Sequence, residues 1–317
     1  MAKNVLGAEV QAGKPKFWKR VYRQRYLFLM SLPFVVWLII FAYIPLLGWS
    51  YAFVDFIPGK SVFECEFVGL KYFAEMFTDP MFFNAFKNTI IMSVLGLVFG
   101  SFLCPLFFAV LLHETRSIKL KKSVQTVSYL PHFVSWVVVS GIVLQMLSPE
   151  GGMVNNILMA LHIIDEPVNI IGMPEHFYLI ITVANIWKEL GWSAIIYISA
   201  MSGIDTELYE AAAVDGAGRF RRIWSITLPG IRNTIIILLI MNIGSLINSG
   251  FEAQMLLTNA LNERVTEVLG LYILNYGIGM QRFSFGTAAG IFTSLCSCFL
   301  VLIANAISKR TTEQALF

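Results

Sequence analysis

Apolar residues dominate six long stretches of the chain, and shorter polar segments separate them. A helix needs about 20 apolar residues to cross the hydrocarbon core of a bilayer, and each stretch reaches that length. The stretches cover residues 26–48, 89–113, 124–147, 177–200, 233–256 and 285–308. This pattern predicts an all-α polytopic membrane protein with six transmembrane helices.

The same pattern divides the chain into an N-terminal segment 1–25, a transmembrane domain 26–308 and a tail 309–317. The first apolar stretch starts late, runs long and lacks a clear small-residue cleavage site. We therefore expect a retained helix there rather than a signal peptide.

Composition supports a membrane protein and argues against several other classes. The chain is 57% hydrophobic and 14% charged, whereas a soluble domain carries about 25% charged residues. Its histidines and cysteines lack ligand or CxxC spacing, which argues against a metal site or a disulfide framework. The sequence contains no GxxxxGKS or GxxxxGKT motif, so it cannot bind ATP through a P-loop of its own. No basic face typical of nucleic-acid binding is visible.

The basic residues predict the orientation of the six helices. Lys and Arg cluster in the N-terminal segment, after the second stretch, after the fourth stretch and at the C-terminus. In a six-helix topology these four segments lie on one side of the membrane, and basic residues favour the cytoplasmic side. We expect both termini and the 201–231 connection to be cytoplasmic.

The most polar insertion in the C-terminal half follows the fourth stretch. Asp205 or Thr206 can cap a short helix that ends near Val214, because their side chains accept hydrogen bonds from free backbone N–H groups. Gly216 and Gly218 then permit a turn. A second short helix, 219–227, should end at Pro229. The apolar side chains of this insertion need a partner protein to cover them: Leu208, Tyr209, Val214, Phe220, Ile223 and Ile226.

Three motifs in this insertion resemble the coupling loop, or EAA loop, of importer-type ABC transporter permeases. They are Glu210-Ala211-Ala212, Asp215-Gly216-Ala217 and Leu228-Pro229. By composition alone, the segment could be an ordinary helix–glycine–helix connection. The resemblance implies that the loop 204–230 seats in a cleft of an ATPase through Glu210, Ala211, Ala212, Asp215, Gly216 and Ala217.

Further motifs resemble the sugar-uptake branch of the same family, in the subgroup associated with lipoprotein binding proteins and polysaccharide-derived oligosaccharides. They are Phe67–Phe73, Asn88-Thr89, Tyr129–Phe133 and Asp205–Tyr209, and the resemblance covers roughly 20–315. It implies a type I ABC importer permease fold in a bacterial cell membrane.

The resemblance also implies the partners and the division of labour. A second homologous permease would complete the pathway, and an extracellular solute-binding lipoprotein would deliver an oligosaccharide. Two ATP-binding subunits would hold ATP and Mg²⁺ and hydrolyse the ATP. The chain itself would then bind no cofactor and would not be an enzyme.

Polar side chains at membrane depth are candidates for the substrate path, because they are costly in lipid and usually face a cavity or a partner helix. On a helix of 100° per residue they fall into two arcs, one of about 120° in the fifth stretch and one of about 100° in the fourth. The residues are Asn185, Lys188, Glu189 and Trp192 in the fourth stretch, and Asn242, Ser245, Asn248, Ser249 and Glu252 in the fifth. The alternative is that they join neighbouring helices.

Three other functions compete with sugar import. An ion-coupled secondary transporter would use Lys188, Glu189 and Glu252 as a relay, but it would not need an EAA-like loop. An ABC permease for a non-sugar solute would share every feature above. A membrane-embedded enzyme would need a nucleophile–base or metal constellation, and the sequence does not offer one.

Overall fold

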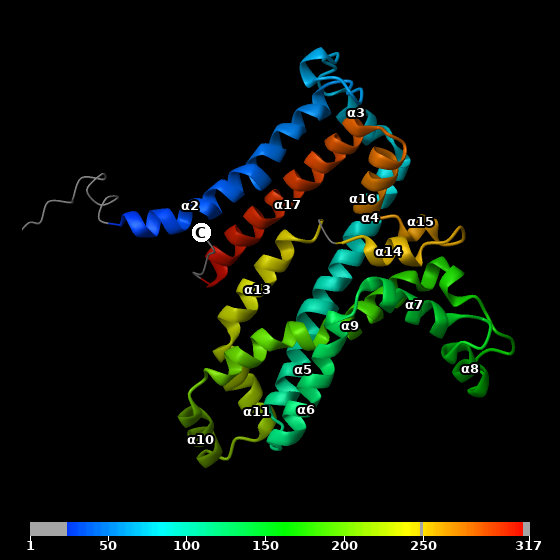
Figure 1. Cartoon of the computed structure of the whole chain (residues 1–317). Coiled ribbons are helices and arrows are strands. Elements are labelled where there is room, and N and C mark those ends of the chain that lie inside the picture. The colour runs from blue at the N-terminus through cyan, green and yellow to red at the C-terminus, as the bar shows by residue number, and fades with distance from the viewer. Residues whose placement is uncertain (1–23, 248–249, 313–317) are drawn as a thin grey trace, which may run out of the picture. The chain divides into compact units, whose positions relative to one another are not determined.

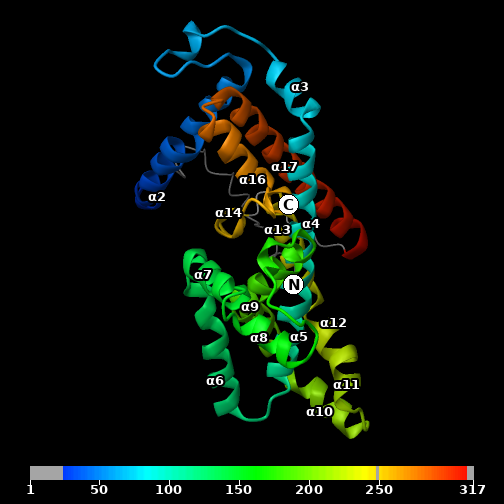
Figure 2. The same ribbon diagram turned by 90° about the vertical axis from the view of Figure 1, so that its right-hand side faces the viewer.

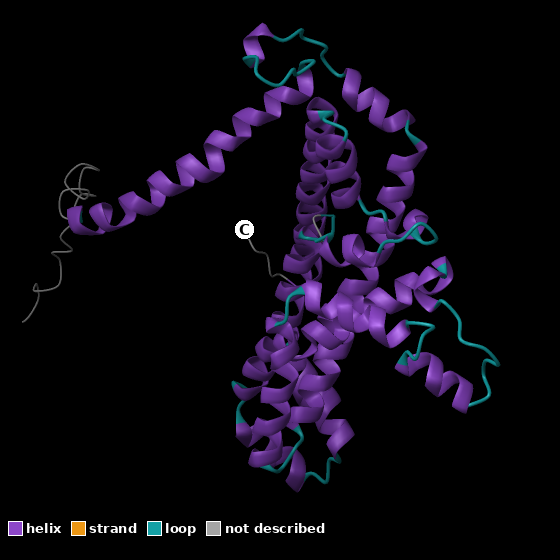
Figure 3. Cartoon of the chain, turned by 45° about the vertical axis from the view of Figure 1, so that its right-hand side comes forward, coloured by secondary structure: helices purple, strands orange, loops and turns teal. Residues whose placement is uncertain are grey.

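The computed structural model describes residues 24–247 and 250–312, and nearly all of the described backbone is helical (Figures 1 and 3). Extended pairing in these ranges is limited to one isolated bridge between Val54 and Phe67. The chain forms two compact units, 1–51 and 52–317. The expected N-terminal segment 1–25 and tail 309–317 lie largely outside the described residues.

The first apolar stretch forms one continuous helical span, Arg25–Phe53. It starts as α2 (Arg25–Leu38), continues through a π-helical segment (Ile39–Tyr43) and finishes as a 3₁₀ segment (Ile44–Phe53).

The second unit consists of helices joined by short loops. Its α-helices are α3 (Lys71–Thr78), α4 (Pro80–Leu95), α5 (Cys104–His113), α6 (Ile118–Tyr129), α7 (Trp136–Leu147), α8 (Met153–Ala160), α9 (Pro174–Ser202), α10 (Thr206–Val214), α11 (Arg219–Arg222), α12 (Leu228–Gly230), α13 (Arg232–Gly244), α14 (Glu252–Leu257), α15 (Glu263–Thr266), α16 (Leu269–Tyr272) and α17 (Phe283–Thr312). Its π-helical segments are Gly96–Leu103, Ile223–Thr227 and Ile273–Gly279, and its 3₁₀ segments are Val62–Glu64, Leu130–Phe133 and Ile170–Gly172.

In the described residues, four helices have the length and composition of membrane spans, and the number rises to six if each of two bent pairs counts as one span. This confirms the all-α polytopic class. Four are continuous helices: Arg25–Phe53, Pro80–His113, Pro174–Ser202 and Phe283–Arg310. The other two are bent pairs, one formed by Ile118–Phe133 with Trp136–Leu147 and one by Arg219–Gly230 with Arg232–Gly244.

Two of the expected spans differ from straight helices. The third bends by 100° between Phe133 and Trp136. Pro131 offers no backbone N–H there, and the Ser135 side chain accepts from the Val138 N–H and caps a new helix that begins at Trp136. The fifth stretch was expected to run from 233 to 256 as one helix. Instead α13 ends at Gly244 and α14 begins at Glu252, since the intervening Gly, Ser and Asn residues are weak helix formers.

Three prolines inside the helices share one arrangement, whereas Pro33 lies within the α-helical turns of α2. Pro45, Pro105 and Pro229 each stand at the second position after a π-helical segment. A proline lacks the N–H group and its ring collides with the carbonyl of residue i−4, so a regular α-helix would break there. A wider π-turn relieves this conflict, and all three helices continue through the proline.

Three buried clusters hold the second unit together. One joins α3, α4, α16 and α17 around Phe82 and Tyr272. The next joins α4, α7, α9 and α14 around Phe177 and Leu257. The last joins α5, α9 and α13 around Tyr197. Helix α9 contributes to two of the clusters and is the central element of this unit.

Buried polar side chains complete the packing around α4. The amide nitrogen of Asn88 donates to the carbonyl oxygens of Arg264 (2.9 Å) and Glu267 (2.8 Å), and its oxygen accepts from the Tyr178 hydroxyl (2.7 Å). The neighbouring Thr89 hydroxyl accepts from the Leu269 N–H at 2.8 Å. The Asn88-Thr89 motif therefore ties α4 to α9 and to the segment before α16.

A second polar group surrounds α3. The Tyr72 hydroxyl donates to Asp55 at 2.7 Å; burial, followed by the interaction with Asp55, raises the pKa of Tyr72 to about 12. Tyr272 bonds to Asp79, and Arg282 pairs with Glu75. Within this unit, α3 and α10 lie at opposite ends, and α4 and α5 run between them (Figures 1 and 2).

Candidate functional site

The loop 204–230 forms two short helices around one glycine turn. The Asp205 carboxylate accepts from the Glu207 N–H at 2.9 Å and caps α10, as expected. At the other end, the Gly216 N–H bonds to the Ala213 carbonyl and the Ala217 N–H to the Ala212 carbonyl, at 3.1 and 2.8 Å. This pair of bonds is the Schellman motif, which requires a left-handed residue after the helix. Gly216 supplies it with φ of +75°.

The two turn glycines expected from the sequence therefore have different roles. Gly218 has φ of −66° and precedes α11 in an extended conformation that any residue can adopt. The second helix also extends further than expected. It passes through α11, the π-helical segment and α12, and it ends at Gly230 rather than at Pro229.

Several contacts fix the two helices of the loop to each other and to the membrane helices. The hydroxyls of Tyr209 and Thr227 are hydrogen-bonded at 2.9 Å, and the Tyr209 ring lies 5.9 Å from the His113 ring, centroid to centroid. At the end of the loop, Gly230 packs against Ile204 so closely that a Cβ there would lie 2.8 Å from the isoleucine side chain. The loop is thus a folded element.

Large apolar side chains nevertheless remain uncovered on this loop. Leu208, Val214 and Phe220 are 54%, 89% and 82% exposed. Trp224, which the sequence reasoning missed, is 71% exposed. A bulky aromatic residue within the second short helix of a polar insertion was the signal for it. The EAA residues lie on α10 and its glycine turn, with Glu210, Ala211, Asp215 and Gly216 exposed and Ala212 and Ala217 half-buried.

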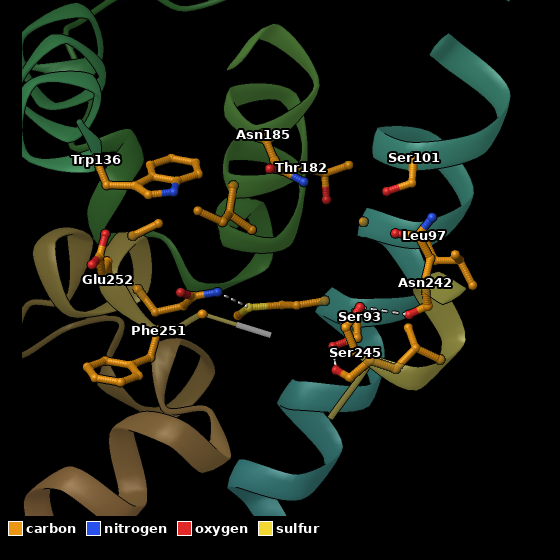
Figure 4. Close-up of a pocket in the computed structure, with 17 residues that line it drawn as sticks. Ser93, Leu97, Ser101, Trp136, Thr182, Asn185, Asn242, Ser245, Phe251 and Glu252 are labelled. Atoms are coloured by element: carbon orange, nitrogen blue, oxygen red, sulfur yellow. Dashed lines mark hydrogen bonds between the residues drawn. The ribbon is translucent and has the colours of Figure 1, made fainter. Parts of the chain in front are cut away.

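A second candidate site is a cavity of about 410 Å³ in the middle of the second unit. Side chains from α4, α7, α9, α13, α14 and the π-helical segment after α4 surround it (Figure 4). Four residues expected on the substrate path line this cavity: Asn185, Asn242, Ser245 and Glu252. Asn248 and Ser249 lie outside the described residues.

The cavity lining combines uncharged polar side chains with aromatic and aliphatic ones. The sequence reasoning missed some of its polar side chains, which come from other helices: Ser93, Ser101, Thr182 and Gln254. Trp136 and Phe251 supply the aromatic faces. Glu252 is the one charged side chain among the described lining residues. Serine and threonine residues inside apolar helices were the signal for the missed residues. Nothing in the sequence showed that these residues lie at the same level of the helix bundle.

One lining side chain has an unused hydrogen-bonding atom. Gln254 is 7% exposed, and its amide nitrogen lies 3.5 Å from the Met92 sulfur. Its amide oxygen has no hydrogen-bond partner among the described residues. An unpaired buried acceptor is costly, and a ligand hydroxyl in the cavity would supply the missing donor.

The charged residues of α9 do not line this cavity. Lys188 is 6% exposed, and its Nζ donates to the His132 carbonyl at 2.6 Å and lies 3.2 Å from Glu189 Oε1. Glu189 Oε2 lies 2.7 Å from His132 Nδ1. The His132 ring stacks on Trp192, with centroids 4.3 Å apart and planes 1° from parallel. We call His132, Lys188, Glu189 and Trp192 the corner cluster, because they gather at the bend of the third span.

Comparisons with known proteins agree with this architecture. The family model described as "Binding-protein-dependent transport system inner membrane component" matches residues 104–313. Protein LplB of Bacillus subtilis (strain 168) is 40% identical over 307 residues, which are 96% of each chain. The polygalacturonan/rhamnogalacturonan transport system permease protein YteP of the same organism is 39% identical over 94% of this chain and 92% of its own length.

A solved structure matches as well. It is a bacterial alginate ABC transporter in complex with an alginate pentasaccharide-bound periplasmic protein. One of its chains is 38% identical, with a TM-score of 0.86, and the match covers 95% of this chain and 99% of that one. The family model, the relatives and the solved structure agree. The chain belongs to the binding-protein-dependent transport system inner membrane components. It is a membrane-embedded permease subunit of an ABC importer, which is a transport component rather than an enzyme.

Proposed function

We propose that this permease imports oligosaccharides that are released from a polysaccharide and delivered by an extracellular solute-binding protein. The observation that carries the proposal is the cavity, in which amides and hydroxyls stand beside the rings of Trp136 and Phe251. Sugars need both kinds of surface, because their hydroxyls form hydrogen bonds and their C–H faces pack on aromatic rings. The transport roles for which YteP and the alginate transporter are named support the same cargo class.

Asn185, Asn242, Ser245 and Glu252 are the residues we propose to contact the cargo. The cavity volume of about 410 Å³ lies within the range of about 300–1,000 Å³ found for small-molecule sites. Asn248 and Ser249 stay proposed path residues on sequence grounds. Lys188, Glu189 and Trp192 are proposed to act from the corner cluster rather than by contact with the sugar.

The exposed loop 204–230 is the proposed docking element for the ATPase. Glu210, Ala211, Ala212, Asp215, Gly216 and Ala217 would seat in a cleft of that subunit, with Leu208, Phe220 and Trp224 covered beside them. This role places the loop and both chain termini in the cytoplasm. Two ATP-binding subunits, with ATP and Mg²⁺, and a second homologous permease would complete the assembly.

An ion-coupled transporter gains no support from the structure or from the relatives. Lys188, Glu189 and His132 bond to one another at the bend, whereas Glu252 lines the cavity on α14. A proton relay would need these groups to form a continuous path.

Purification of the tagged chain from its native membrane in mild detergent tests the proposed assembly. We expect a second permease and a P-loop ATPase to co-purify, and we expect Glu210→Lys to release the ATPase while the second permease stays bound. Recovery of the chain alone, in a preparation that transports under an ion gradient, would refute the proposal.

A further inference from the structure

The bend of the third span is held by charged groups that neither the cavity nor the coupling loop uses. A buried lysine is costly unless its charge is paired and its N–H groups are bonded. Lys188 meets this need by bonding to the backbone carbonyl of His132, at the bend itself, and to Glu189. The side chain therefore fixes the backbone at the point where the chain turns by 100°.

Close backbone packing fixes the same corner from its other side. A Cβ at Gly191 would lie 2.2 Å from the Ser128 carbonyl oxygen and 2.9 Å from the Tyr129 ring. The end of α6 thus rests directly on the backbone of α9, one turn from Lys188. With both contacts made, the last turn of α6 and the 3₁₀ segment after it have little freedom relative to α9.

The corner cluster contacts a residue that lines the cavity. Trp136 is the first residue of α7 after the bend, and it lines the cavity. Lys188 Nζ lies 5.9 Å from the centre of its indole ring, within the range of a cation–π contact. Helix α7 also packs against α14, which carries Glu252 and Gln254. The direction of α7 therefore sets where one aromatic and two polar lining groups stand.

We propose that His132, Lys188 and Glu189 are positioning residues for cargo binding, which hold the bend of the third span so that Trp136 and α14 face the cavity. The proposal rests on the proposed function, since it assumes that the cavity takes the cargo. It gives the polar arc of α9 two separate roles. Asn185 contacts the cargo, while Lys188 and Glu189, one turn further along, fix the corner.

A distance measurement across the bend tests the structural half of the proposal without any cargo. Nitroxide labels would be attached at Val127 on α6 and Ile142 on α7, both exposed, in the assembled complex with the four native cysteines replaced by serine. We expect a single narrow distance distribution in the parent complex and a broad or displaced one in Lys188→Met. Lys188→Arg should restore the narrow distribution, because a guanidinium can bond to both the carbonyl and Glu189. Lys87→Met, at an exposed lysine on α4, is the matched control and should leave the distribution unchanged.

Transport kinetics test the functional half. The probe is uptake of a labelled oligogalacturonide by proteoliposomes that hold the whole complex and its binding protein. Lys188→Met should raise KM about threefold or more, with a smaller effect on the maximal rate. In the Trp136→Ala background the same substitution should add little, since contacting groups that act as one unit are not additive.

The possible outcomes distinguish a failure of the positioning role from a failure of the proposed cargo. If Lys188→Met leaves the distance distribution unchanged, or if its effect on KM adds in full to that of Trp136→Ala, the positioning role is wrong. If Lys188→Met fails to assemble, Glu189→Gln, which keeps the shape of the side chain, takes its place with the same criteria. If the parent complex does not take up the probe, the proposed cargo is wrong. The distance measurement still tests whether the corner cluster holds the bend.

Discussion

At the scale of single residues, three glycines show how backbone geometry decides which positions tolerate a side chain. Gly216 has a left-handed φ and closes the Schellman turn of α10. Gly191 lies against the backbone of α6. Gly218 has an ordinary φ and open space around it. From the sequence, Gly216 and Gly218 have the same expected role as turn residues. In the structure, only Gly216 of the two has a left-handed φ.

Gly216→Val should uncouple transport from ATP hydrolysis while the chain still inserts and folds. A β-branched residue at φ of +75° costs about 1–3 kcal/mol of strain, and the turn that carries Asp215 and Ala217 would change shape to relieve it. Co-purification of the ATPase and ATP-driven uptake measure the effect. Gly218→Ala is the matched control and should behave as the parent. Normal uptake by Gly216→Val at normal expression would contradict the coupling role.

Gly191→Ala should lower the stability of the folded chain by about 1–3 kcal/mol, as expected for overpacking against backbone that cannot move aside. The thermal midpoint of the purified complex measures this. Gly141→Ala, a helical glycine of α7 with no atom near its Cβ position, is the control and should leave the midpoint in place. Equal midpoints for the two variants would argue against the close contact between α6 and α9.

At the scale of elements, local signals predicted helix ends well and long-range geometry poorly. The cap at Asp205 and the stop at Gly216 depend on neighbouring residues, so the sequence alone predicted them correctly. The bend after Pro131 and the break after Gly244 interrupt apolar stretches that are each long enough to cross a membrane, so the apolar pattern did not predict them. The polar arc of the fifth stretch assumed one straight helix, whereas Asn242 and Glu252 come from α13 and α14 and line the same cavity only through tertiary packing.

Gly100→Ala should weaken cargo binding without unfolding the π-helical segment Gly96–Leu103. The new Cβ would lie 2.9 Å from the Asn185 amide nitrogen, the end of a flexible side chain, so that amide must leave its place at the cavity. We expect the KM of uptake to rise about threefold to tenfold, as for the loss of one or two hydrogen bonds. Gly96→Ala, with its nearest atom at an ordinary 3.7 Å, should have a smaller effect. A larger effect for Gly96→Ala would remove Asn185 from the cargo site.

At the scale of the whole molecule, the second unit holds two candidate functional regions. The loop 204–230 exposes apolar side chains at one end, and the cavity lies among α4, α7, α9, α13 and α14. The EAA motif predicts a coupling role for the first region from sequence alone, because its residues are contiguous. The cavity could be predicted only in part, since Ser93, Thr182 and Gln254 lie far apart in the chain and carry no shared motif.

ATP-dependent uptake by the reconstituted complex tests the central claim most directly. Proteoliposomes would contain this chain, its co-purifying permease and ATPase, and the binding protein loaded with labelled oligosaccharide. The account predicts uptake that requires ATP and Mg²⁺, persists when ion gradients are collapsed, and is lost in the Glu210→Lys and Gly216→Val variants. Uptake that continues without ATP and stops when an ion gradient is collapsed would contradict it.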